Sequence, residues 1–238
     1  MLIKDYTVKR QTDYWLGEFF VMASPCQVLL DSVDEAQADS LTALAYAEAK
    51  RIELKYSRFC DDNIIARLNH SADEAIALDE ETTRLINLAD LCFQLSDGLF
   101  DISAGVLGKL WHFKQQTQLP SDADINALLP KVGWQKAQWK APLLTLPMDM
   151  QIDLGGIGKE YAVDKVALLL NSTLQQQQTD SAFLINFGGD IYANKLRNNG
   201  EAWQVAIEDP KRLGESKLMV CLAQGGLASS GNSQRFID

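Results

Sequence analysis

The sequence predicts an α+β (mixed α/β) fold, because stretches of strand type and helix type alternate irregularly along it. Residues 34–56 and 79–97 carry apolar residues at helical spacing, whereas short apolar runs such as residues 182–187 have the length of buried strands. The 238 residues are 47% hydrophobic and 23% charged, which suits a large core. No repeat or linker separates domains, so we expect a single domain over residues 1–238.

The first third of the chain predicts a strand pair followed by two long helices. Residues 16–31 are of strand type, with a break at Ala23-Ser24-Pro25. Ser32 or Asp34 then caps a helix that runs to about residue 56. After a polar loop and a short helical turn at residues 64–69, Asp79 caps the second helix, which stops at Asp97-Gly98.

The remainder predicts shorter elements. Ser103 could cap a short helix to Trp111, and Asp101 just before it has either a dipole-stabilised structural role or a ligand role. Ser121 caps another short helix, and residues 138–154 suggest a hairpin turning near residues 147–149. The expected elements that follow are a helix at 159–171 and strands at 182–187, 203–208 and 218–223.

A glycine-rich turn lies between an apolar run at residues 143–154, which predicts a strand, and the helix that begins near Lys159. Free backbone N–H groups and the helix dipole make such a turn an anion site, and glycine lets a phosphate approach the backbone. Lys159 adds a positive charge, and Asp153 a metal or hydroxyl partner. A tight turn without any ligand is the alternative reading.

Composition excludes several classes of function. The net charge of −10 and the absence of a basic stripe argue against nucleic-acid binding. Only His70 and His112 are present, so a histidine-rich metal site is excluded. No apolar run reaches membrane-spanning length, and Glu18 interrupts the one N-terminal segment that looks like a signal.

The four cysteines are widely spaced and lack metal-binding spacing, so we expect free thiols. Three of them, Cys26, Cys92 and Cys221, lie in apolar surroundings of the sequence and are expected in the core. Free thiols suit a reducing compartment.

Two familiar catalytic patterns fit poorly. The turn at Gly155-Gly156-x-Gly158 lacks the third glycine of a dinucleotide-binding motif and does not open a βαβ unit. No GxSxG motif is present for a serine nucleophile.

Several glycine-rich turns with acidic or hydroxyl residues instead mark the ends of regular elements. Together with aromatic residues such as Phe59 and Phe100, they suit a ligand with a flat ring and a pyrophosphate. These turns are Gly98-Leu99-Phe100-Asp101, Asp153-Leu154-Gly155-Gly156, Gly188-Gly189-Asp190 and Ser229-Ser230-Gly231.

In order and spacing, these motifs resemble the ApbE family, the FAD:protein FMN transferases. The family's Met-Gly-Thr strand break is Met22-Ala23-Ser24 here, and its long glycine motif matches residues 153–164, with Gly158 and Glu160 as departures. The other matches are Ser57-Arg58-Phe59, Arg67-Leu68-Asn69, Leu110-Trp111, Trp203, Ile207 and Asp209-Pro210, besides the remaining turns above.

The resemblance implies an ApbE-like fold with β-sheets flanked by long helices. It implies a transferase that moves FMN from FAD to a Thr or Ser hydroxyl of a target flavoprotein, releases AMP and uses Mg²⁺. Lys159 would neutralise phosphate charge, and the backbone carbonyl of Gly156 would bind the metal. The residues implied to bind FAD are Met22, Phe59, Leu99, Phe100, Asp101, Asp153 and Lys159.

The family pattern continues with a His-x-x-Asp-Pro-x-x-Gly segment and an Asp…Thr region, whereas this sequence ends at Asp238. We therefore expect the C-terminal portion and the remaining metal ligands to lie beyond Asp238. With Gly156 alone, Mg²⁺ binding should be weak, because one carbonyl cannot dehydrate a hard cation.

Two alternatives to transfer stay open: a FAD-binding relative inactive in transfer, and a FAD pyrophosphatase that yields FMN and AMP. The lack of a visible signal predicts a cytoplasmic protein, with a trimmed exported chain as the alternative. No motif indicates the acceptor protein, the catalytic base or the oligomeric state.

Overall fold

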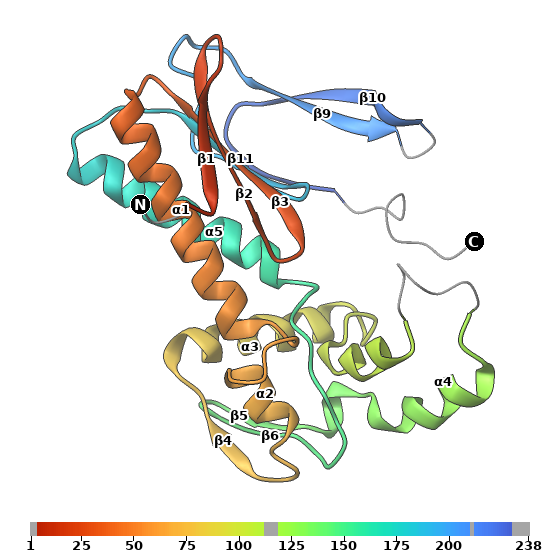
Figure 1. Cartoon of the computed structure of the whole chain (residues 1–238). Helices are drawn as coiled ribbons and strands as arrows, with labels where there is room; N and C mark the ends of the chain where they lie inside the picture. Colours follow the sequence, from red (N-terminus) through yellow and green to blue (C-terminus); the bar gives the residue numbers. More distant parts are fainter. Residues whose placement is uncertain (1–3, 112–118, 210–211, 230–238) are drawn as a thin grey trace. The chain divides into compact units, whose positions relative to one another are not determined.

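The computed structural model of the chain describes residues 4–111, 119–209 and 212–229 (Figure 1). Helices and strands are mixed, so the predicted fold class is confirmed. The described residues form two compact units, one made of the chain up to Glu53 and from Lys159 onward, the other of Leu54–Gly158. A single domain over residues 1–238 stays a prediction, and Pro210, Ser230 and Gly231 lie outside the described residues.

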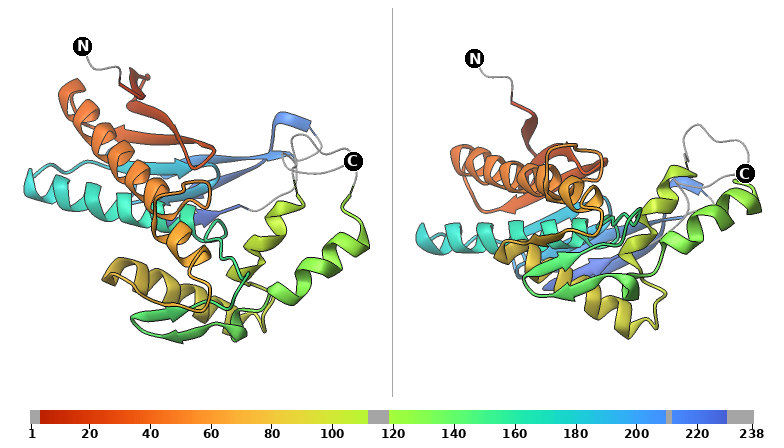
Figure 2. Two further views of the ribbon diagram at one scale, coloured as in Figure 1. Left: turned by 60° about the horizontal axis from the view of Figure 1, so that its bottom comes forward. Right: turned by 90° about the horizontal axis from the view of Figure 1, so that it is seen from below.

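The first unit is built on an antiparallel sheet with the strand order β1-β2-β3-β7-β8-β11. Helices α1 (Glu35–Tyr56) and α5 (Gly158–Gln176) run alongside this sheet, as Figure 2 shows from two further sides. Two further strands, β9 (Trp203–Asp209) and β10 (Arg212–Leu222), pair with each other. The sheet strands are β1 (Tyr6–Arg10), β2 (Tyr14–Val21), β3 (Ser24–Asp31), β7 (Phe183–Phe187), β8 (Asp190–Ala193) and β11 (Gly225–Ala228).

The second unit holds a small sheet and short helices. Its three strands, β4 (Ala75–Ala77), β6 (Leu143–Thr145) and β5 (Gln138–Lys140), pair in that order. Its longest helix is α3 (Glu80–Leu95). The other helices are α2 (Ile64–Asn69), α4 (Asp122–Leu128) and the 3₁₀ segments η1 (Ile102–Lys109), η2 (Leu129–Lys131) and η3 (Trp134–Lys136).

Capping residues fix the starts of the helices where the sequence indicated them. The side chain of Asp34 accepts a hydrogen bond from the amide of Gln37 (2.8 Å), and Asp79 and Ser121 cap α3 and α4 in the same way. The predicted caps of these three helices are therefore confirmed. The predicted apolar stripe of α1 is buried as well: Leu41, Ala45, Ala49, Ile52 and Tyr56.

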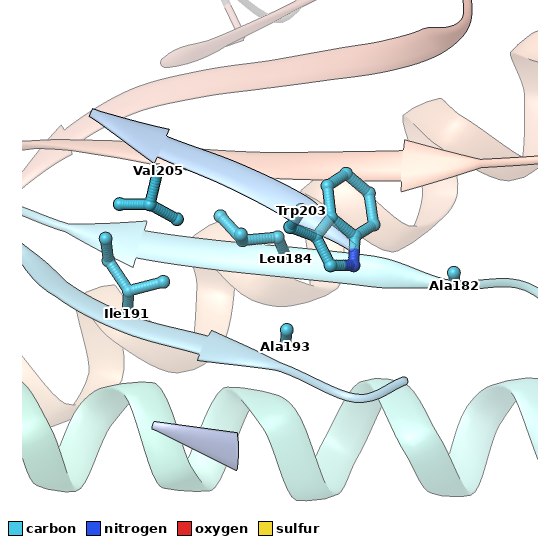
Figure 3. Close-up of a cluster of buried hydrophobic side chains, with 6 residues drawn as sticks. All are labelled: Ala182, Leu184, Ile191, Ala193, Trp203 and Val205. Carbon is cyan, nitrogen blue, oxygen red and sulfur yellow. The ribbon is translucent and has the colours of Figure 1, made fainter. Parts of the chain in front are cut away.

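The core of the first unit involves both sides of its main sheet. Phe19 of β2 packs edge-on against Phe187 of β7 and Tyr46 of α1, with ring centroids 5.6 Å apart in each pair. A second cluster joins β7 and β8 to Trp203 and Val205 of β9 (Figure 3). Because β9 buries its apolar side chains on the sheet, the two-stranded β9–β10 pair is anchored to it.

The apolar run at residues 143–154 is not one strand, so that prediction is wrong. Only Leu143–Thr145 pairs as a strand, and the hairpin turns at Ala141-Pro142 rather than near residues 147–149. Beyond it the backbone of Ile152 bonds to a side chain: Asn69 accepts its N–H at 2.8 Å and donates to its carbonyl at 3.1 Å. The Asn69 side chain thus supplies the two backbone hydrogen bonds that a neighbouring strand would give Ile152.

All four cysteines are free thiols, as expected. Cys26 is buried, Cys92 is half-buried and Cys221 is exposed, so the prediction of a core Cys221 is wrong. Among the described helices, none is both long and apolar enough to cross a membrane.

The buried Cys26 thiol should resist alkylation. Burial raises its pKa to about 11, so it is protonated at pH 8 and shielded from reagents. We expect mass spectrometry after brief iodoacetamide treatment at pH 8 to show modified Cys221 and unmodified Cys26. Equal labelling of the two thiols would contradict this burial.

Candidate functional site

The residues to which the sequence assigned roles fall into two clusters, one in each unit. Met22 and Lys159 belong to the first unit, where they lie near the turns at one end of the main sheet. We call this group the sheet-end cluster: Met22, Ser24, Lys159, Gly188, Gly189 and Asp190. The others belong to the second unit, around what we call the Asp153 cluster: Arg58, Phe59, Phe100, Asp153 and Gly156.

Two tight turns meet in the sheet-end cluster. The β2–β3 turn at Met22-Ala23 and the β7–β8 turn at Gly188-Gly189 are neighbours, because β3 pairs with β7. The amide of Gly188 donates to the carbonyl of Pro25 at 3.1 Å. A Cβ on Gly188 would lie 2.8 Å from Ser24 Oγ and 3.9 Å from Lys159 Nζ. Glycine is therefore required there by the close approach as well as by its φ of 62°.

Lys159 reaches the same turns from the first turn of α5. Its Nζ lies 2.9 Å from Asp190 Oδ2, and the side chain of Asp190 is 8% exposed while that of Lys159 is 32% exposed. The nearly buried carboxylate fixes the amine, while one side of the amine still faces solvent. A cation held beside two backbone turns has the chemistry of an anion site.

Asp153 is held firmly in the second unit. Its Oδ2 lies 3.2 Å from Arg58 Nε, and its Oδ1 accepts the amide of Gly155 at 2.8 Å. Arg58 in turn donates to the carbonyl of Gly105 at 3.2 Å and lies over the ring of Phe59, 4.7 Å from its centroid. The structure thus joins Asp153 to Phe59 through an arginine to which the sequence assigned no role.

The apolar residues predicted to bind the flavin differ in exposure. Phe59 is 82% exposed and Leu99 93% exposed, so both present apolar surface to solvent. Phe100 lies against Gly156, where a Cβ would come within 3.1 Å of its Cε2 atom. Phe100 and Gly156, predicted to serve the flavin and the metal, are therefore neighbours.

Asp101 is the cap of η1, and the expectation that Ser103 caps this helix is wrong. Its Oδ1 accepts the amide of Ser103 at 2.8 Å and the Ser103 hydroxyl at 2.6 Å, and its Oδ2 accepts the amide of Trp134 at 3.0 Å. The segment Asp-Ile-Ser offers two capping side chains, and the helix begins at the earlier one. A ligand role for Asp101 stays a prediction.

Side-chain ligands for a metal ion are not clustered in the described residues. Throughout residues 4–111, 119–209 and 212–229, no group of three or more His, Cys, Asp or Glu side chains could hold a metal ion. Gly156 is exposed, but the nearby Asp153 carboxylate is occupied by Arg58 and Gly155. A hard cation needs several oxygen ligands. The metal role of Gly156 and the ligands expected beyond Asp238 stay predictions.

Sequence reasoning missed three polar residues at these clusters: Arg58, Asp190 and Glu53. Arg58 and Asp190 lie inside motifs that the sequence did display, so their positions were a usable signal. Glu53 lies within α1, and its carboxylate accepts the amide of Met22 at 2.6 Å. A glutamate in the last turn of a helix carries no local signal for such a role.

Removing the Asp153 carboxylate should weaken FAD binding. In Asp153→Ala, Arg58 loses its partner and the Gly155 amide its acceptor, so the turn before Gly156 loosens. We expect an increase of about tenfold in the Kd for FAD, measured by quenching of flavin fluorescence. Asp149→Ala, which breaks the exposed pair with Lys131, is the matched control. Equal Kd values for Asp153→Ala and the wild type would remove Asp153 from the FAD site.

Comparison with known proteins gives a consistent result. The model of the ApbE family matches residues 22–238. The chain is 27% identical over 222 residues to the FAD:protein FMN transferase of Klebsiella pneumoniae (89% of this chain, 62% of the relative). It is 25% identical over 228 residues to that of Salmonella typhimurium (91% and 63%). The chain thus spans somewhat less than two thirds of these relatives.

A solved structure shows the same fold. The crystal structure of the ApbE protein from Thermotoga maritima superimposes with a TM-score of 0.85 at 24% identity, covering 94% of this chain and 72% of that one. The predicted ApbE-like fold is therefore confirmed.

Proposed function

The chain belongs to the ApbE family, and from this premise we propose that it is a Mg²⁺-dependent FAD:protein FMN transferase. In the proposed reaction, a Thr or Ser hydroxyl oxygen of a target flavoprotein attacks the phosphorus on the FMN side of the FAD pyrophosphate. A phosphoester bond to the acceptor forms, the bond from that phosphorus to the AMP oxygen breaks, and the hydroxyl proton is released. The products are the FMN-bearing protein and AMP.

The Lys159–Asp190 pair is the observation that carries this proposal. Charge builds on the phosphoryl oxygens during attack, and a fixed cation beside them lowers the barrier. Asp190 holds the amine at 2.9 Å, and the Lys159 side chain is 32% exposed, so a phosphate can reach it from solvent. Lys159 is therefore assigned to phosphate neutralisation, and Asp190 to positioning Lys159.

The second unit offers surface suited to the flavin ring. Phe59 and Leu99 leave large apolar areas uncovered, and such side chains stack on flat rings. The Arg58 guanidinium behind Phe59 holds that ring from its other side. We assign Phe59, Leu99 and Phe100 to the ring.

Mg²⁺ belongs to the proposal through the family resemblance, and it would offset the negative charge of the pyrophosphate. No step is assigned to it, because the described residues show no cluster of three or more His, Cys, Asp or Glu side chains that could hold it.

The test is to incubate the chain with FAD, Mg²⁺ and a flavin-free target flavoprotein that carries an acceptor Thr. We expect an increase in acceptor mass equal to one FMN, with stoichiometric AMP. The same acceptor with its Thr changed to Ala is the control, and an arm with EDTA tests the metal. FMN and AMP without a mass gain would show FAD hydrolysis instead, and intact bound FAD would show a binding protein.

A further inference from the structure

Two hairpins of the main sheet use the same kind of two-residue turn but different residues. The β7–β8 turn has Gly188 and Gly189, with φ of 62° and 101°. The β2–β3 turn has Met22 and Ala23, both with φ of 54°. A hairpin turn of this kind, type I′, has positive φ at both central positions, which glycine adopts freely and residues with a Cβ do not. The Met22-Ala23 turn is therefore strained and must be held by its surroundings.

Glu53 supplies a contact that holds it. Its Oε1 accepts the Met22 amide at 2.6 Å, and its Oε2 lies 2.6 Å from Lys50 Nζ. The Glu53 side chain is 21% exposed, so this bond is partly shielded from water. On the inner side of the turn, the Ser24 hydroxyl donates weakly to the Met22 carbonyl at 3.4 Å. A charged acceptor makes the Glu53 bond the stronger one.

The packing of α1 on β2 brings Glu53 to this place. Three contacts between β2 and α1 follow one another along the strand. Gly17 lies against Thr42, Phe19 packs on Tyr46, and the amide of Met22 bonds to Glu53. From Thr42 to Glu53 the helix advances about 16 Å. From Gly17 to Met22 the strand advances about 17 Å. The helix and the strand thus cover nearly the same distance between the first and the last contact, so they run alongside each other.

Glu53 also lies at the end of the sheet that carries Lys159. It accepts the amide of Met22, two residues before Ser24, and a Cβ on Gly188 would lie 2.8 Å from Ser24 Oγ and 3.9 Å from Lys159 Nζ. The carboxylate therefore lies in the part of the unit that holds the sheet-end cluster.

We propose that Glu53 is a positioning residue that fixes the Met22-Ala23 turn and thereby the affinity for FAD. Its carboxylate holds the Met22 amide in the left-handed conformation, which sets where the half-buried Met22 side chain points. This inference rests on the proposed function and on the role in FAD binding that the family resemblance implies for Met22. A glutamate that served only α1 would leave the turn unchanged when replaced.

The experiment compares Glu53→Ala, Glu53→Gln, Ala23→Gly and the double variant Glu53→Ala/Ala23→Gly. The Kd for FAD is read from flavin fluorescence, and the exchange rate of the Met22 amide from NMR. We expect Glu53→Ala to raise the Kd and to speed Met22 exchange, each about tenfold. Glu53→Gln keeps an acceptor oxygen, and its Kd should stay within about threefold of the wild type.

The double variant is the decisive arm. Glycine at position 23 takes the positive φ without strain, so Ala23→Gly should bring the Kd of Glu53→Ala back to within about threefold of the wild type. Glu48→Ala, which breaks an ion pair with Arg51 on the same helix, is the matched control and should leave the Kd unchanged.

Three outcomes separate the possibilities. Unchanged Kd and unchanged Met22 exchange in Glu53→Ala would overturn the inference. A raised Kd that glycine at position 23 does not restore would also overturn it, because the turn would not be the cause. A wild-type chain that binds no FAD would overturn both the proposed function and the claimed effect on affinity. The exchange rate of the Met22 amide in Glu53→Ala would then still show whether Glu53 holds the turn.

Discussion

Replacing Lys159 with alanine is expected to lower the rate of FMN transfer by about 10²- to 10³-fold at saturating FAD. The amine is held by Asp190 near Gly188 of the β7–β8 turn, and it is partly exposed, so a phosphoryl oxygen can reach it. Because the charge it neutralises grows during the reaction, the loss should fall mainly on kcat. Single-turnover transfer to the acceptor, followed by mass spectrometry, measures it.

Lys165→Ala is the matched control for this prediction. Lys165 lies on the same helix with its Nζ 6.0 Å from the centroid of the Tyr161 ring, away from the Lys159–Asp190 pair. Its loss should leave transfer within about twofold, since a partly exposed cation–π contact at this distance contributes little. An unchanged rate in Lys159→Ala would reduce Lys159 to a residue that merely begins α5.

Asp190→Asn separates positioning from charge. The amide keeps the shape of the side chain but no longer forms the ion pair, so the Lys159 amine becomes less well placed. We expect a loss of about tenfold, smaller than that of Lys159→Ala. A larger loss than in Lys159→Ala would mean that Asp190 acts directly on the substrate.

The sequence predicted the local features of the fold well, because their causes are local. The caps at Asp34, Asp79 and Ser121 each need only one side chain and the amides just after it. The turn at Gly188-Gly189 needs positive φ values at two adjacent residues, which a glycine pair signals. Where a preference is contained in a few consecutive residues, reading it off the sequence suffices.

Two of the failures, the strand expected at residues 143–154 and the core position of Cys221, are places where the surroundings in the fold decide. Alternate residues of the run at 143–154 are buried, a pattern typical of a strand: Leu144, Leu146, Ile152 and Leu154. Of these, only Leu144 lies in a strand, β6. Asn69, 83 residues earlier than Ile152, supplies the hydrogen bonds that a strand would. Similarly, Cys221 has apolar neighbours in sequence, yet its side chain is exposed on β10.

The candidate site shows the same division. The motifs marked Lys159, Asp153 and Phe100, whose turns are local. They gave no sign that Glu53 holds the Met22 amide, because that contact depends on how α1 packs along β2. Nor did they show that both oxygens of Asp101 are used within the second unit.

The packing of α1 on β2 leads to the second large prediction, that Gly17→Ala destabilises the protein by about 3 kcal/mol. A Cβ on Gly17 would overlap Thr42 Oγ1 and lie 2.6 Å from its Cγ2, and Thr42 is fully buried. For a chain of this size, the Tm should fall by about 10 °C in thermal denaturation followed by circular dichroism. Gly158→Ala is the matched control, because a Cβ there meets nothing within 4 Å and α5 gains a better helix former.

A second substitution identifies the cause. In Gly17→Ala/Thr42→Ala the overlapping atoms are gone, and only the Cβ of residue 42, 3.0 Å away, remains close. The hydroxyl lost from Thr42 is buried, and it has no hydrogen-bond partner in the described part of the chain, so its removal costs little. We expect the double variant to regain at least half of the lost stability.

Because Thr42 and Glu53 lie on one rigid helix, a Cβ on Gly17 that pushes α1 away from β2 should also lengthen the hydrogen bond between Glu53 and the Met22 amide. Gly17→Ala should then weaken FAD binding from a position far along the strand from the turn, and the double variant should restore both properties together. Stability restored without affinity would mean that the helix–strand spacing does not set the turn.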